Sequence, residues 1–128
     1  MSAGKTVLIV EDEVSLIIAL RDKFFHEGFT VLEAKNGEEG LGVALDKHPD
    51  MILLDIIMPV MDGITMLKKL RESGEWGKTA QVIILTNLNE AEKVSEAMAA
   101  GTYEYLVKSD WKIADIVNKV KEKLEIKA

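Results

Sequence analysis

Five short apolar runs, each followed by a stretch with helical periodicity, constrain the fold of this chain more than any other feature. Strands are expected at Thr6–Val10, Phe29–Ala34, Met51–Leu54, Gln81–Leu85 and Tyr103–Val107. Helices are expected at Val14–Glu27, Glu38–Lys47, Gly63–Glu72, Glu90–Ala100 and Asp110–Glu125. Most of the strand runs are rich in Val, Ile and Leu, as parallel strands covered on both faces are. The alternation predicts an α/β fold: a doubly wound five-stranded parallel sheet with right-handed crossovers.

Length and charge narrow the class of protein. A chain of 128 residues is expected to form a single domain, residues 1–128, with a core from about 5 to 124 and no room for an output domain of ordinary size. The net charge of −6 argues against direct binding to nucleic acid or anionic membranes. No run is long enough to span a membrane, no signal-peptide pattern is present, and the absence of cysteine fits a cytoplasmic protein.

Polar side chains follow four of the five predicted strands at their carboxyl ends. Glu11 and Asp12 follow the first, Asp55 the third, Thr86 the fourth and Lys108 the fifth, whereas the second strand ends unremarkably. Open α/β sheets bind their ligands outside the carboxyl ends of the strands. These five side chains are therefore expected to share one cleft.

The residue types in this cleft indicate a chemistry. Three carboxylates close together repel one another, and a hard divalent cation with oxygen ligands relieves that repulsion. Mg²⁺ suits a site with few carboxylates, some water and a phosphate. Lys108 adds a positive charge and Thr86 a hydroxyl donor. Together they could transfer a phosphoryl group onto a carboxylate nucleophile.

These motifs together resemble the receiver domain of two-component response regulators. The resemblance rests on Glu11-Asp12, on Asp55 followed by Met58-Pro59 and Asp62-Gly63, and on Thr86 and Lys108, and it extends from about Lys5 to Leu124. It implies the strand order 2-1-3-4-5 in a flavodoxin-like three-layer sandwich. It also implies a phosphorylated signalling domain, not an enzyme in the ordinary sense, that assists its own phosphorylation and dephosphorylation.

The resemblance assigns a role to each residue of the cleft. Asp55 would accept a phosphoryl group from a phosphohistidine of a sensor kinase or phosphotransfer protein. Mg²⁺ would be held by Asp12, Asp55 and the backbone carbonyl of Ile57, with Glu11 acting largely through water. Lys108 would pair with Asp55 and then with the phosphoryl oxygens, and Thr86 would bond the phosphoryl group. Tyr105 would turn inward behind Thr86, and the surface of the fourth helix, fifth strand and fifth helix would then bind a downstream protein.

The chain departs from the family pattern around this cleft. Ser109 stands where the family usually has proline, so a cis bond is not expected there, and Ser109 or Asp110 could cap the last helix. Asn87 stands where a small residue is more common. Ile57 and Leu88 are both apolar, and we hypothesise that they exclude attacking water and lengthen the lifetime of the acyl phosphate.

The first predicted helix carries two apolar residues on its outer side. With Leu16, Leu20 and Phe24 as the buried stripe, Ile18 and Phe25 face the opposite way. Isolated surface apolar residues are common in soluble proteins. Because receivers dock with this helix, we hypothesise that Ile18 and Phe25 contact the histidine-bearing helices of the kinase.

Alternative readings remain for single residues and for the whole chain. Each cleft residue alone would be an ordinary surface or capping group, with Asp62 in turn chemistry, Trp76 in local packing, and His26 and His48 exposed. A flavin or nucleotide enzyme would need a loop rich in Gly, Ser or Thr after the first strand to cradle phosphate, where this chain has Glu11-Asp12-Glu13. A Mg²⁺-dependent phosphatase would need a second acid at position 57. The remaining alternative is a receiver-like interaction module that is not phosphorylated.

Overall fold

The sheet has the predicted order and direction. The computed structural model describes residues 4–86, 91–101, 104–108 and 111–125. All strand pairs are parallel, in the order β2-β1-β3-β4-β5. The strands are β1 (Thr6–Val10), β2 (Thr30–Ala34), β3 (Met51–Asp55), β4 (Val82–Thr86) and β5 (Tyr105–Val107). The fold prediction, a flavodoxin-like doubly wound sheet, is confirmed.

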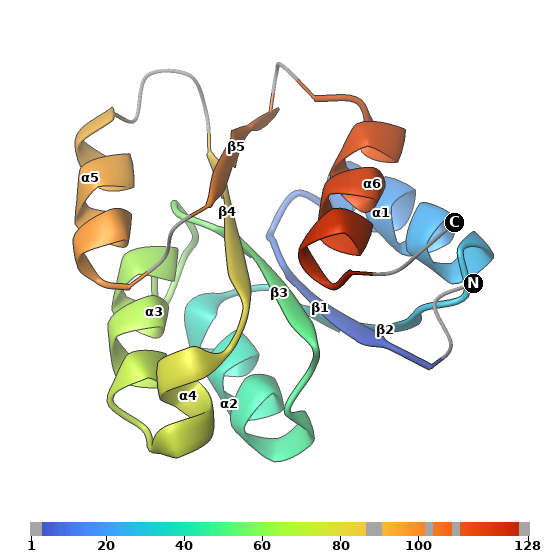
Figure 1. Ribbon diagram of the computed structural model, residues 1–128. Helices are drawn as coiled ribbons and strands as arrows, with labels where there is room; N and C mark the ends of the chain where they lie inside the picture. Colours follow the sequence, from blue (N-terminus) through green and yellow to red (C-terminus); the bar gives the residue numbers. More distant parts are fainter. Residues whose placement is uncertain (1–3, 87–90, 102–103, 109–110, 126–128) are drawn as a thin grey trace.

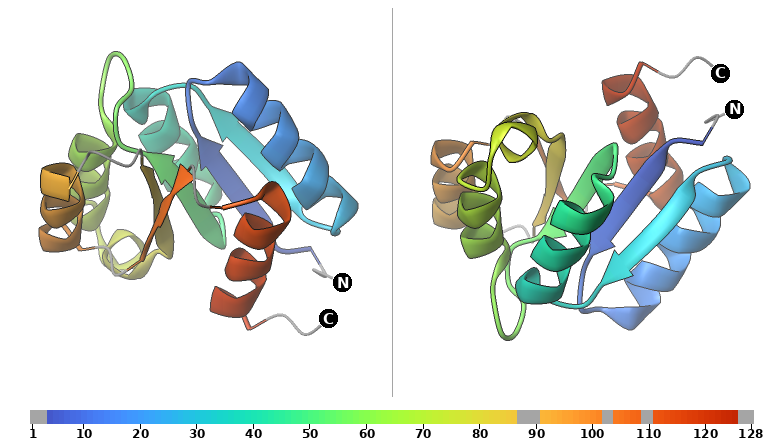
Figure 2. Two further views of the ribbon diagram at one scale, coloured as in Figure 1. Left: turned by 90° about the horizontal axis from the view of Figure 1, so that it is seen from above. Right: turned by 90° about the horizontal axis from the view of Figure 1, so that it is seen from below.

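Helices cover both faces of the sheet. They are α1 (Val14–His26), α2 (Gly37–Lys47), α3 (Gly63–Arg71), α4 (Glu75–Thr79), α5 (Ala91–Ala99) and α6 (Ile113–Lys123). Helices α1 and α6 lie together on one face, and α2, α3 and α5 lie on the other (Figures 1 and 2). In the described part of the chain, no helix is long and apolar enough to cross a membrane.

Alternation along the strands builds one apolar core on each face. In β1, Val7 and Ile9 join the cluster under α1 and α6, whereas Leu8 and Val10 join the cluster under α2, α3 and α5. Successive side chains of a strand point to opposite faces, so one central strand serves both cores. The same requirement makes every residue of β3 buried, including Asp55 at its end.

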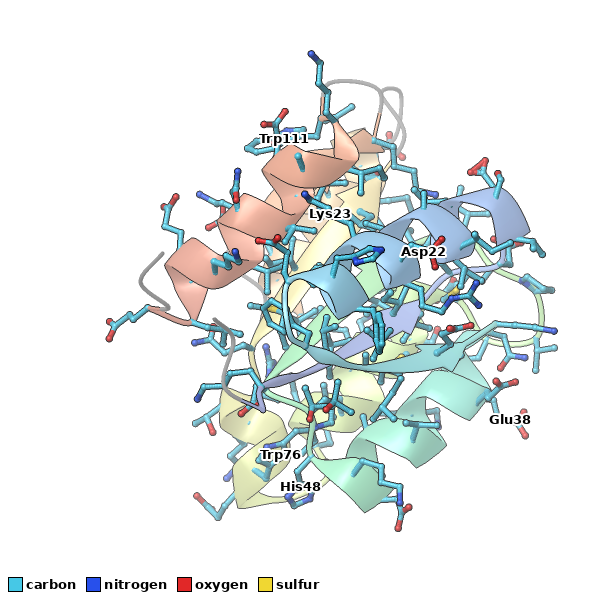
Figure 3. All side chains as sticks on the ribbon, turned by 90° about the vertical axis from the view of Figure 1, so that its right-hand side faces the viewer. Asp22, Lys23, Glu38, His48, Trp76 and Trp111 are labelled. Atoms are coloured by element: carbon cyan, nitrogen blue, oxygen red, sulfur yellow. The ribbon has the colours of Figure 1, made fainter. Side chains whose placement is uncertain are left out.

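Helix α4 lies between the expected helix Gly63–Glu72 and the expected strand Gln81–Leu85, where no element was predicted. A helix of five residues is too short to show an apolar period. The expected packing role of Trp76 is confirmed, because Trp76 packs against the core cluster. His48 is exposed as expected, but its ring stacks on Trp76 with centroids 4.2 Å apart (Figure 3).

Two helices have N-cap residues other than those considered from the sequence. Helix α6 begins at Ile113 with Lys112 at its N-cap, so it starts later than the expected Asp110; the Asp115 carboxylate accepts from the Lys112 N–H at 3.3 Å. Helix α1 has Glu13 at its N-cap, so Glu11 and Asp12 do not cap it. Ser109 and Asp110 lie outside the described residues.

The expected buried stripe of α1 is confirmed at Leu20 and Phe24, Leu16 packs against the same core, and Ile17 is buried in addition. Ile17, Leu20 and Phe24 are buried, and Leu16 is half-buried. Ile18 and Phe25 point outward as predicted, with 42% and 71% of their surfaces exposed. The helix therefore presents apolar side chains to solvent.

Candidate functional site

Strand register brings the acidic residues and Lys108 together at the carboxyl edge of the sheet. Val10 is paired with Leu54, so the next residues, Glu11 and Asp55, emerge side by side. Thr86 is the last residue of β4, one step beyond the Asp55–Leu85 pair. Val107 is paired with Thr86, which delivers Lys108 to the same edge. The predicted convergence is thus a direct consequence of the register.

Lys108 bridges two buried carboxylates. Its Nζ lies 2.6 Å from Oε1 of Glu11 and 3.2 Å from Oδ1 of Asp55. Glu11 is completely buried and Asp55 is 4% exposed. The pairing with Asp55 follows the resemblance, whereas the shorter contact with Glu11 was not foreseen.

The buried carboxylates of this cluster are not fully neutralised by Lys108, and this shifts the pKa values of the group. Burial, followed by the neighbouring Asp55, raises the pKa of Glu11 to about 8, with Lys108 acting in the opposite direction. Burial alone would lower the pKa of Lys108, but the contacts with Glu11 and Asp55 outweigh it and raise that pKa. The cluster therefore holds a proton tightly when nothing else neutralises it.

The three acids fit a divalent cation. Carboxylate oxygens of Glu11, Asp12 and Asp55 all lie within 4.8 Å of one another. Oε2 of Glu11 is buried and has no hydrogen-bond partner among the described residues. With all three acids ionised and Lys108 protonated, the formal charge is −2, which one Mg²⁺ would neutralise. The donor set consists of oxygen only, as Mg²⁺ prefers.

The loop after β3 is pressed against the end of the strand. The Gly63 N–H donates to the Ile56 carbonyl at 2.7 Å, and a Cβ on Gly63 would lie 2.1 Å from the Asp55 carbonyl oxygen. Only glycine permits this approach. Asp62 accepts from the Thr65 N–H at 2.8 Å and thereby caps α3, where the sequence had suggested turn chemistry.

The remaining predicted site residues differ in position and exposure, and Tyr105 is paired with Ile84, two residues before the end of β4. Thr86 is buried beside the acid cluster at the end of β4. Ile57 is 57% exposed in the loop after Asp55, and Tyr105 in β5 is 43% exposed. Asn87 and Leu88 lie outside the described residues.

One feature of the loop gave no signal in the sequence. Val60 has a backbone φ of 69°, and its side chain is 75% exposed. A β-branched residue is strongly disfavoured in this region of backbone space, where glycine and asparagine are more usual. Because Val60 lies five residues after Asp55, the strain is stored in the loop that borders the acid cluster.

Comparison with known families agrees with this arrangement. A family model described as the response regulator receiver domain matches residues 7–121. This chain belongs to that family. The receiver domain is 33% identical to sporulation initiation phosphotransferase F of Bacillus subtilis over 125 residues, which cover 98% of each chain. It is 32% identical to chemotaxis protein CheY of the same organism, covering 80% of this chain and 83% of that protein.

Longer relatives and solved structures extend the likeness. The receiver domain is 38% identical to regulatory protein AtoC of Escherichia coli, covering 84% of this chain but only 23% of that protein. A receiver domain protein of Methanospirillum hungatei superimposes with a TM-score of 0.86 at 27% identity, covering 95% of this chain and 94% of that one. A CheX–CheY–BeF₃–Mg²⁺ complex from Borrelia burgdorferi gives a TM-score of 0.81 at 32% identity, covering 94% of this chain and 89% of that one. Receiver domains with this acidic pocket are typical of phosphorylatable response regulators.

Proposed function

We propose that this receiver domain is a switch of a two-component system in which Asp55 accepts a phosphoryl group from a histidine kinase or a phosphotransfer protein. The observation that carries the proposal is the contact of Lys108 with both Glu11 and Asp55. A lysine already placed at the acceptor oxygen has its charge where phosphoryl oxygens would arrive. A cluster that only shared a proton between its acids would not require a lysine at this position.

In the proposed step, an oxygen of Asp55 attacks the phosphorus of the phosphohistidine. The P–N bond breaks, its electron pair returns to the imidazole nitrogen, and an aspartyl phosphate forms. Lys108 stabilises the incoming negative charge, and its move toward the phosphoryl oxygens weakens its contact with Glu11. Thr86, buried at the neighbouring strand end, donates its hydroxyl to a phosphoryl oxygen.

Asp12, Asp55 and the backbone carbonyl of Ile57 would hold Mg²⁺, with Glu11 acting through water. When bound, Mg²⁺ would supply the positive charge that the three acids and the phosphoryl group require. Oε2 of Glu11, buried and without a partner among the described residues, supports this assignment, because a buried carboxylate oxygen without a partner is costly.

A surface change would follow phosphorylation. Tyr105 is half exposed and is paired with Ile84, two residues before Thr86 on the neighbouring strand, and its ring would turn inward when Thr86 moves. The proposed output surface is formed by α5, β5 and α6, and it would bind a downstream protein in the cytoplasm. On the other side of the site, the exposed Ile18 and Phe25 of α1 would receive the phosphodonor.

Intact-mass measurement with a small phosphodonor tests the proposal. The protein is incubated with acetyl phosphate and Mg²⁺, and a gain of one phosphoryl group is expected. Asp55→Asn should abolish the gain. Asp62→Asn is the matched control, because asparagine also caps a helix and Asp62 lies in the adjoining loop. An unmodified wild-type protein under these conditions would favour the alternative, an interaction module that is not phosphorylated.

A further inference from the structure

Among the described side chains, helix α5 contacts the apolar core through its last turn and the residue that follows it. Among the side chains of α5 that the structure describes, only Ala97 is fully buried. Ala100, directly after the helix, packs against the same apolar cluster. The described side chains from Glu92 to Glu96 are exposed or half-buried and do not belong to that cluster. Two alanines offer little apolar surface, so a further contact must position the helix.

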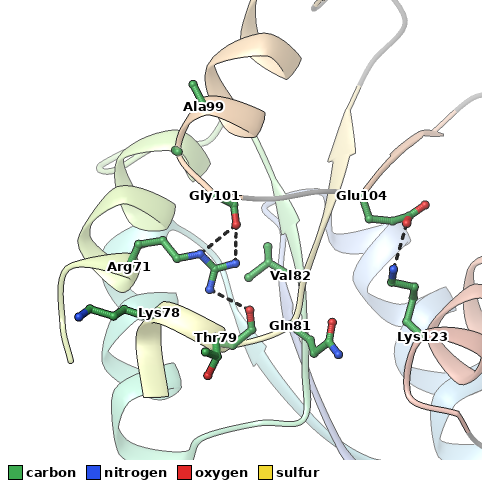
Figure 4. A pocket seen from close by; sticks show the side chains of 11 residues that line it. Arg71, Lys78, Thr79, Gln81, Val82, Ala99, Gly101, Glu104 and Lys123 are labelled. Atoms are coloured by element: carbon green, nitrogen blue, oxygen red, sulfur yellow. Dashed lines mark hydrogen bonds and ion pairs between the residues drawn. The ribbon is translucent and has the colours of Figure 1, made fainter. Parts of the chain in front are cut away.

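Arg71 supplies that contact from the end of α3. Its Nε and Nη2 donate to the Gly101 carbonyl at 3.0 and 2.8 Å (Figure 4). Its Nη1 donates to the carbonyls of Gly77 and Ala80 at 2.8 Å each. Carbonyls at the C-terminal end of a helix carry partial negative charge. One guanidinium therefore ties the C-terminal ends of α4 and α5 together.

Gly101 is matched to this arginine in two ways. Its φ of 106° lies in the region that favours glycine. A Cβ at this position would lie 3.0 Å from Arg71 Nε, closer than side chains normally approach. Gly101, two residues after the end of α5, thus leaves space for the guanidinium.

The other cations of this cleft have separate partners. Lys78 pairs with Glu75, and Lys123 pairs with Glu104 on the far side of a cavity of about 470 Å³. Figure 4 shows Arg71 directed at Gly101, with the Glu104–Lys123 pair at a distance from it. Of the cationic side chains that the structure describes in this cleft, Arg71 is therefore the one that contacts the end of α5.

The Arg71 contact and the acid cluster lie at opposite ends of the sheet. Gln81 and Val82 at the start of β4 line the Arg71 cleft, whereas Thr86 ends the same strand beside Asp55. Helix α5 has nine residues and is about 13 Å long. A fixed point at Gly101 leaves the beginning of α5 with the longest lever arm.

We propose that Arg71 is the fixed anchor of α5, so that displacement of this helix is a rotation about Gly101 with its largest amplitude at the first turn. The anchor belongs to the resting fold and does not depend on phosphorylation. Its use in signalling rests on the proposed function, in which an event at Asp55 moves α5. Arg71 is a positioning residue and contacts none of the acids.

Residue-resolved amide hydrogen exchange of the unphosphorylated, Mg²⁺-free protein tests the anchor. The reporters are the N–H groups of Ala100 and Gly101, which donate to Glu96 and Met98 within the last turn. Arg71→Met should raise their exchange rates about tenfold or more relative to amides in α1. Arg71→Lys should give a smaller increase, because lysine lacks the planar fork.

Lys78→Met is the matched control, since it removes a cation from the same cleft without touching α5, and it should leave these rates unchanged. Unchanged rates in Arg71→Met would overturn the proposal. An equal increase in every helix would also overturn it, because that pattern indicates general destabilisation.

Amide chemical shifts with acetyl phosphate and Mg²⁺ test the rotation. In the wild type, shifts in α5 should change most at Ala91–Lys93 and least at Gly101, and Arg71→Met should lose this gradient. Larger changes at Ala97–Gly101 than at the first turn would refute the rotation. If Asp55 gains no phosphoryl group, the proposed function fails, while the exchange experiment still decides whether Arg71 is the anchor.

Discussion

The Lys108 ammonium lies closer to Glu11 than to the proposed phosphoacceptor Asp55, at 2.6 against 3.2 Å. The resting site is thus a three-group contact in which one cation serves two buried acids. Arrival of a phosphoryl group at Asp55 would compete with Glu11 for that cation. This competition links the chemistry at the end of β3 to the position of the segment that carries Lys108.

Replacing Lys108 by methionine should destabilise the Mg²⁺-free protein. The loss is expected at about 1–3 kcal/mol near pH 6, because Glu11 can retain a proton and limit the cost. It should grow toward pH 9, where Glu11 ionises without a counter-charge. Denaturant unfolding in EDTA at both pH values measures this, with Lys112→Met as an exposed control. Equal losses at the two pH values would contradict the coupling.

Glu11 should make the metal-free protein less stable as pH rises. Its pKa is raised from 4.5 to about 8 in the folded state, so between these values the folded protein holds a proton that the unfolded chain has released. Stability is then fully present below about pH 4.5 and decreases toward pH 8, by on the order of a few kcal/mol. Glu11→Gln should remove this component in EDTA.

Mg²⁺ provides the complementary measurement. At pH 8 it should raise the melting temperature of the wild type by binding the folded state. Asp12→Asn should reduce this stabilisation. An unchanged melting temperature of the wild type in millimolar Mg²⁺ would argue against the metal assignment.

Ile57 should lengthen the lifetime of the aspartyl phosphate. Its side chain is 57% exposed in the loop beside Asp55, where it can limit the approach of water. Ile57→Asn should speed dephosphorylation about tenfold, corresponding to about 1.4 kcal/mol in the barrier. The decay is followed by intact mass after removal of acetyl phosphate, and Val60→Asn introduces the same amide elsewhere in the loop as a control. A slower or unchanged decay in Ile57→Asn would refute the hypothesis.

Val60→Gly should stabilise the protein in spite of the added flexibility of the unfolded chain. A left-handed backbone costs a non-glycine residue roughly 1–2 kcal/mol, whereas glycine loses about 0.5–1 kcal/mol in entropy. With φ at 69° and an exposed side chain, the net gain is expected at about 0.5–1 kcal/mol. Denaturant unfolding measures it. A less stable variant would show that the exposed side chain contributes more than the strain costs.

The outer face of α1 should be needed for transfer from a protein donor only. The protein donor is first identified by testing phosphotransfer from the sensor kinases and phosphotransfer proteins of the source organism. Ile18→Lys combined with Phe25→Lys is expected to slow phosphotransfer from that donor. Phosphorylation by acetyl phosphate, which needs no docking surface, should be unchanged. Leu45→Lys is the control, because Leu45 is an equally exposed residue of α2 on the other face. Normal transfer to the double variant would exclude this face as the dock.

Much of the fold was predictable because parallel strands buried on both faces must be apolar throughout. That requirement marks β1, β3 and β4 in the sequence, and it makes Asp55 conspicuous at the end of β3. Strand ends in turn predicted the gathering of Glu11, Asp12, Thr86 and Lys108. The short helix α4 and the later start of α6 were missed, since neither follows from an apolar period.

The sequence by itself determined the class of sheet and the identity of the acids. Apolar residue types indicate which strands are buried, and the alternation of strands and helices indicates that the strands are parallel. Only the tertiary structure decided how those groups are paired. Whether Lys108 contacts Glu11 as well as Asp55, and whether Arg71 reaches Gly101, depends on register and on the distance between elements far apart in the chain. Such distances are set by packing of the whole core, which no local pattern of residues encodes.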